Sequence, residues 1–295
     1  MAHGIPLDDS VRADSPRKDG TSEVSSDIAY QRLVLVNVVY YGLPNADDGA
    51  WVLIDAGISG MTDRITGAAE KRFRAGSRPA CIILTHGHFD HTGVLQELAE
   101  LWDVPIYAHE LECPYLNGNA AYPPPDPGVG GGIISLLSPL FPRGPIDVSR
   151  WLRPLPVDGT VPGMPGWKWI HTPGHSPGHI SLWRESDRVI IAGDAVITTA
   201  QESAYAVAIQ RTELHGPPMY FTSDWTAANA SVKRLAALQP DILVTGHGRA
   251  MHGEEMRAAL NTLAREFDEI AVPKHGKYVD DPARAEDGSA YSEPG

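Results

Sequence analysis

The chain has 295 residues, of which 42% are hydrophobic, and its formal net charge is −13. This length supports a substantial core, while the acidic balance argues against binding to nucleic acid or anionic membranes, since both favour basic surfaces. Two cysteines, Cys81 and Cys113, are too few for a disulfide framework or a zinc knuckle. The N-terminus lacks the apolar stretch of a signal peptide, and no apolar run approaches the roughly 18 residues that span a bilayer, so we expect a cytoplasmic protein.

Composition divides the chain into a polar leader, a globular domain and a polar tail. Residues 1–25 and 276–295 are charged and without periodicity, which predicts disorder at both ends. We therefore expect a single domain over 26–275. Within it, residues 111–166 hold 12 of the 25 prolines. This pattern predicts a long Pro/Gly-rich insertion with a short helix at 132–138, and loops of such length usually have a function, such as that of a lid.

The globular part alternates between β-rich runs and segments with helical spacing. We predict strands at 32–42, 50–57, 80–85, 104–109, 167–175, 179–185, 188–194 and 241–248. We predict helices at 61–76, 92–102, 224–239 and 253–270. The last of these places apolar residues at intervals of three and four, which gives it one apolar face. The mixture predicts an α/β fold.

The segment THGHFDH, residues 85–91, follows an apolar strand. In an extended segment, residues i and i+2 point the same way, so His86 and His88 can bind one ion. Asp90 and His91 lie just past them, where the chain turns, and can serve a second ion. Asp194 ends another apolar run and has two oxygens with which to bridge two metals. Zinc prefers imidazole nitrogen and carboxylate oxygen, and a catalytic site keeps one position open for water.

Further histidines lie at the ends of later strands, where sheet-based enzymes build their sites. His171, His175 and His179 occur in HTPGHSPGH, and His247 occurs in VTGHG. We expect His171 and His179 to have structural or supporting positions and not to be ligands.

Four motifs in this order, THGHFDH, TPGHSPGH, AGDA and TGHG, follow an early VLIDAG. Together they resemble the metallo-β-lactamase fold superfamily of hydrolases over about residues 30–250. The resemblance implies an αββα sandwich of two mixed β-sheets flanked by helices, with the site at one sheet edge. It implies two zinc ions per chain, with iron or manganese as alternatives. The implied ligands are His86, His88 and His175 for one metal, Asp90, His91 and His247 for the other, and Asp194 as the bridge.

The chemistry implied is attack by a metal-bound hydroxide on a small ester, lactone or thioester, as in lactonases and thioesterases of the glyoxalase II type. Asp90 is the expected catalytic residue, which steers the nucleophile or passes a proton to the leaving group. The same fold hosts other reactions. One alternative is an oxidoreductase resembling persulfide dioxygenases, with one iron on His86, His175 and Asp194. Others are a phosphodiesterase and a β-lactamase.

The expected partner is a small-molecule substrate, with no nucleic acid and no membrane. Aromatic and polar residues of the loop after Asp194 are candidate substrate contacts, namely Tyr205, His215, Tyr220 and Phe221. The aromatic loops are equally compatible with a homodimer contact.

Overall fold

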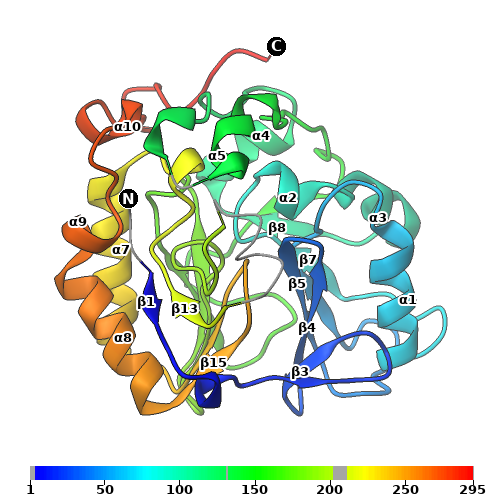
Figure 1. The fold of residues 1–295 in the computed structure, drawn as a ribbon. Coiled ribbons are helices and arrows are strands. Elements are labelled where there is room, and N and C mark those ends of the chain that lie inside the picture. Colours follow the sequence, from blue (N-terminus) through cyan, green and yellow to red (C-terminus); the bar gives the residue numbers. More distant parts are fainter. Residues whose placement is uncertain (1–3, 131, 202–210, 295) are drawn as a thin grey trace.

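The computed structural model describes residues 4–130, 132–201 and 211–294. Two β-sheets lie at its centre and helices cover the outer face of each (Figure 1). One sheet has eight strands in the order β2 to β9, and the other has five in the order β10-β11-β12-β14-β15. A short third sheet pairs β1 with β13. The predicted αββα sandwich is confirmed.

The strands, in chain order, are β1 Ile5–Pro6, β2 Ser15–Pro16, β3 Ser22–Ser25, β4 Ile28–Leu33, β5 Val36–Tyr41, β6 Val52–Ile54, β7 Cys81–Ile83, β8 Ile106–Ala108, β9 Leu152–Pro154, β10 Trp167–His171, β11 Ile180–Arg184, β12 Val189–Ile191, β13 Glu213–Leu214, β14 Ile242–Val244 and β15 Met251–His252. The α-helices are α1 Thr62–Arg72, α2 Phe89–Thr92, α3 Leu95–Trp102, α4 Cys113–Leu116, α5 Ile133–Leu137, α7 Trp225–Ala237, α8 Gly253–Arg265, α9 Phe267–Ile270 and α10 Lys277–Asp280.

Alternation along the strands explains the layers. In β6, Leu53 belongs to the core beneath α1 and α3, while Val52 and Ile54 face the space between the sheets. In β12, Ile190 likewise packs towards α7 and α8, while Val189 and Ile191 face the inter-sheet core. Because side chains of successive strand residues point to opposite faces, an entirely apolar strand requires cover on both faces. The helices cover the outer face of each sheet, and the opposite sheet covers the inner face.

Parallel pairing brings the carboxyl ends of several strands to one edge of the sandwich. β6 pairs parallel with β7 in one sheet, and β12 pairs parallel with β14 in the other. The polar motifs begin immediately after these strands. The edge where the strands end is therefore where those motifs meet.

The structure differs from the sequence prediction at the first long strand. The run 32–42 contains a tight hairpin, with Leu33 of β4 opposite Val36 of β5. Val34 takes a left-handed backbone conformation at the turn, with φ of 65°. The turn residues are apolar and include neither Gly nor Asn, which are typical of tight hairpins. The apolar run therefore predicts one continuous strand.

The polar ends of the chain also differ from the expected disorder. In the leader, β2 and β3 extend the eight-stranded sheet, and Asp14 makes an ion pair with Arg249 at 3.0 Å. In the tail, the Tyr278 hydroxyl donates to the Pro124 carbonyl at 2.5 Å. Composition predicts disorder where few apolar groups can be buried. It contains no information about hydrogen bonds or ion pairs with residues distant in the sequence, which hold both ends here.

The Pro/Gly-rich segment 111–166 is not wholly an insertion. The predicted short helix is present as α5, but β9 is an integral strand, which pairs parallel with β8 at the edge of the larger sheet. Within the described residues, no helix combines the length and apolar character needed to cross a membrane.

Candidate metal centre

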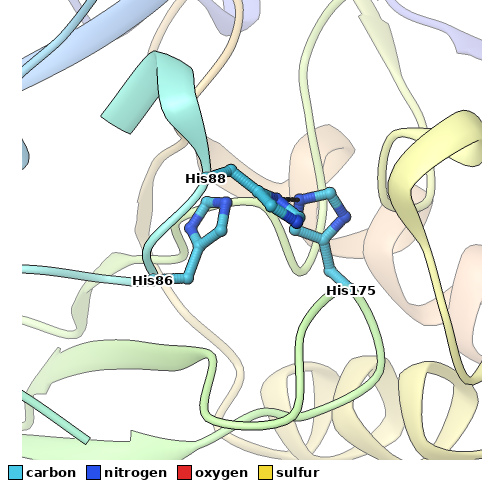
Figure 2. A group of neighbouring side chains, drawn as sticks. All are labelled: His86, His88 and His175. Carbon is cyan, nitrogen blue, oxygen red and sulfur yellow. Dashed lines mark hydrogen bonds between the residues drawn. The ribbon is translucent and has the colours of Figure 1, made fainter. Parts of the chain in front are cut away.

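Three histidines from two loops converge at the sheet edge. His86 and His88 flank Gly87 after β7, and His175 lies in the loop between β10 and β11. Their candidate ligand atoms all lie within 4.8 Å of one another. Figure 2 shows the three rings pointing toward one another, and His88 Nδ1 lies 2.9 Å from His175 Nε2. We call His86, His88 and His175 the histidine triad.

The histidine triad is held in the neutral form. Burial, reinforced by repulsion from neighbouring imidazoles, lowers the pKa of His86 and His175 well below its usual value. The same causes lower the pKa of His88 to about 3. Neutral imidazoles are the form that binds metal ions.

Asp90, His91 and His247 form a second group, which we call the mixed triad. Their candidate ligand atoms also lie within 4.8 Å of one another, and His247 Nε2 is 3.4 Å from Asp90 Oδ2. Burial lowers the pKa of His91, but the carboxylates of Asp194, Asp55 and Asp90 outweigh it and raise that pKa well above its usual value. A negative field that attracts a proton to this position also attracts a metal cation.

Asp194 lies between the two triads. Its Oδ1 is 3.5 Å from His91 Nε2, and its Oδ2 is 3.0 Å from His247 Nε2 and 3.6 Å from His175 Nε2. The side chain is buried. One carboxylate thus reaches histidines of both triads.

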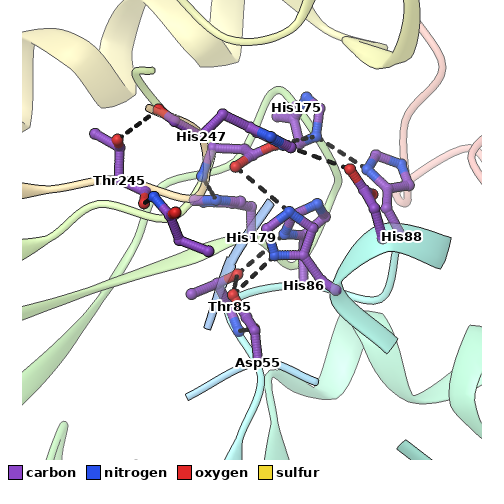
Figure 3. A network of polar contacts seen from close by, with 12 residues as sticks. Asp55, Thr85, His86, His88, His175, His179, Thr245 and His247 are labelled. Carbon is purple, nitrogen blue, oxygen red and sulfur yellow. Dashed lines mark hydrogen bonds and ion pairs between the residues drawn. The ribbon is translucent and has the colours of Figure 1, made fainter. Parts of the chain in front are cut away.

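Hydrogen bonds hold the Nδ1 proton of four histidines, which directs each Nε2 into the site. Figure 3 shows Asp55 and Thr85 beside His86 in this network. The acceptors are Thr85 Oγ1 for His86 at 3.1 Å, Asp55 Oδ2 for His91 at 2.8 Å, Thr222 Oγ1 for His175 at 3.3 Å and the Leu35 carbonyl for His247 at 2.7 Å. The two threonine hydroxyls donate their own protons elsewhere, to Asp55 and to the Pro218 carbonyl, so they can only accept here. Such partners fix the tautomer of metal-binding histidines.

Three buried polar atoms at the centre have no hydrogen-bond partner among the described residues: His86 Nε2, His91 Nε2 and Asp194 Oδ1. Buried polar atoms are nearly always paired, because an unpaired one costs free energy. Two nitrogens and one carboxylate oxygen aimed at one another are a suitable donor set for a divalent metal ion. The residues present therefore fit a metal.

Residues 32–247 match the family model of the metallo-beta-lactamase superfamily. The chain belongs to this superfamily. Probable metallo-hydrolase YflN of Bacillus subtilis (strain 168) is 49% identical over 236 residues, which cover 80% of this chain and 89% of that protein. Family and site together make the chain a metal-dependent hydrolase.

Two solved structures share the superfamily fold. A beta-lactamase domain protein from Burkholderia ambifaria is 22% identical, covers 90% of this chain and 79% of its own, and has a TM-score of 0.61. A protein solved in a di-iron-bound form is 24% identical, covers 80% of this chain and 96% of its own, and has a TM-score of 0.51.

In this metallo-β-lactamase superfamily member, His179 supports the site, in agreement with the prediction. The Asp194 backbone N–H donates to His179 Nε2 at 2.9 Å, so His179 Nδ1 carries the proton and donates to Thr172 Oγ1 at 2.9 Å. His179 thereby holds the backbone of the carboxylate that lies between the triads.

The predicted substrate contacts are dispersed. Phe221 stacks on the His88 ring, with centroids 4.7 Å apart and planes at 28°. Tyr220 is buried beside Phe221, with its ring 5.0 Å from that ring. His215 lies next to β13, where its Nε2 is 3.0 Å from Glu213 Oε2. Tyr205 lies outside the described residues.

Sequence reasoning missed two buried carboxylates, Asp55 and Glu112. Asp55 ends the VLID run after β6, and a carboxylate at the end of an apolar strand is the same signal that identified Asp194. Glu112 lies in the Pro-rich segment and has no such signal. Its side chain is nonetheless fully buried between the loops of the histidine triad.

Proposed function

We propose that the chain is a di-zinc hydrolase that cleaves a small ester, lactone or thioester. One observation carries the proposal: two triads of buried ligand atoms lie side by side, with Asp194 between them. That is the arrangement expected of a two-metal hydrolytic site.

In this proposal the histidine triad would hold one ion, the mixed triad the other, and Asp194 both. Ions bound there supply a nucleophile from water near neutral pH and polarise the substrate carbonyl. Nitrogen and oxygen donors without thiolate suit zinc. The di-iron form of a structural neighbour makes iron the first alternative to test.

Residues of the chain would orient the histidine ligands and transfer a proton to the leaving group. The acceptors behind His86, His91, His175 and His247 hold the Nδ1 proton, so that Nε2 is the nitrogen that faces the site. Asp90, at the edge of the mixed triad, is our candidate for proton transfer to the leaving group.

Charge supports a small substrate. Two divalent ions would exceed the charge of Asp90 and Asp194, the two carboxylates proposed to hold them, and would stabilise the oxyanion that develops on a carbonyl. The whole chain carries −13, which disfavours a long polyanion such as nucleic acid. We therefore propose a small molecule as the partner, with neither nucleic acid nor membrane, and a homodimer as compatible.

Metal analysis of the purified protein is the first test, followed by a panel of lactones, thioesters, aryl esters, β-lactams and a phosphodiester. About two zinc ions per chain with ester, lactone or thioester turnover are expected. The matched variants are His88→Ala, which should lose metal and activity, and His252→Ala, an exposed histidine, which should keep both. One iron per chain with oxygen uptake on a persulfide would overturn the proposal.

A further inference from the structure

Glu112 lies between the two loops that carry the histidine triad. Its fully buried carboxylate accepts at Oε2 from the Gly87 N–H at 2.9 Å and from the Tyr122 hydroxyl. At Oε1 it accepts from the Gly178 N–H at 2.7 Å and from Ser176 Oγ at 2.8 Å. Gly87 lies between His86 and His88, and Ser176 follows His175. One side chain thus joins the two loops of the histidine triad.

Two glycines make this approach possible. A Cβ atom at position 87 would lie 2.7 Å from Tyr122 Oη, and one at position 178 would lie 2.8 Å from Glu112 Cγ. Both distances are shorter than side chains tolerate. The glycines of THGH and SPGH therefore admit the carboxylate between the loops. Building on the proposed function, we infer that Glu112 is a positioning residue that sets the geometry of the metal site at the histidine triad.

Glu112→Gln tests this role, because an amide has one acceptor oxygen and its NH2 group would face two donors. Affinity for one of two zinc ions should fall by about 10- to 100-fold in a chelator competition, with the second ion retained. Glu110→Gln, an exposed neighbour, is the matched control. The Co²⁺-loaded protein should show a changed absorption spectrum for the weakened site only.

Ser176→Ala and Tyr122→Phe each remove one hydroxyl that donates to Glu112 and keep the packing. They test the role of Glu112 if the Glu112→Gln variant does not fold. Each should weaken the same ion by a smaller factor. Unchanged affinity for both ions in Glu112→Gln, or in both of the milder variants, would overturn the inference.

Discussion

Asp55 Oδ2 lies 2.8 Å from His91 Nδ1, and both side chains are buried. Asp55 also accepts hydrogen bonds from the Thr85 N–H and the Thr85 hydroxyl, both at 2.8 Å. Since Thr85 in turn accepts from His86, this one carboxylate orients a histidine of each triad.

The first prediction follows from that contact. Asp55→Asn keeps the shape but replaces an acceptor of His91 by a neutral amide. Zinc affinity and kcat/KM should each fall by about 10- to 100-fold, because a carboxylate behind a ligating histidine raises its basicity. Competition with a chromophoric chelator measures the affinity. Asp63→Asn on the exposed start of α1 is the control, and equal affinity in both variants would contradict the assignment.

We expect Asp194 to be required for the binding of two metal ions at the same time. Asp194→Asn removes the charge between the triads, so the metal content should fall from about two ions to one or fewer and kcat/KM by more than about 100-fold. Mass spectrometry of the native protein counts the ions directly. Two ions bound by this variant with full activity would show that Asp194 does not bridge.

Removal of metal should lower thermal stability. Without ions, His86 Nε2, His91 Nε2 and Asp194 Oδ1 remain buried and without hydrogen-bond partners within the described residues. A ligand at 100 times its Kd stabilises the folded state by about 2.7 kcal/mol, which corresponds to roughly 5–10 °C in a chain of this size. Differential scanning calorimetry with and without a chelator measures the shift, and added zinc should restore it. His88→Ala should show a smaller shift than the unaltered protein.

The leader should contribute to stability and not to chemistry. Asp14 is buried against Arg249, with Oδ2 to Nη2 at 3.0 Å, and accepts from the Tyr30 hydroxyl at 2.8 Å. Asp14→Asn should lower the free energy of unfolding by about 1–2 kcal/mol, a range discounted for the partial exposure of Arg249. Urea denaturation measures this, with Glu254→Gln on the surface as the control. Because the pair lies outside both triads, kcat/KM should stay unchanged.

The sequence by itself identified the candidate ligand residues that the structure brings together. His86, His88, Asp90 and His91 are neighbours along the chain, and Asp194 and His247 each follow a short apolar strand. Their convergence is predictable because apolar periodicity identifies strands, and parallel strands end at a common edge. The helices α1, α3, α7 and α8 were predictable for the same reason, since each has a periodic apolar face.

Only the tertiary structure decided the surroundings of that centre. Asp55, Thr222 and the Leu35 carbonyl orient histidines that lie between 36 and 212 residues away in sequence. Glu112 joins two loops, and the Tyr278 hydroxyl links the C-terminal segment to the Pro124 carbonyl. Local periodicity reports which face of an element is buried, whereas a hydrogen bond between distant loops depends on how the elements pack. The candidate ligands could therefore be predicted from the sequence, while the contacts that orient them required the fold.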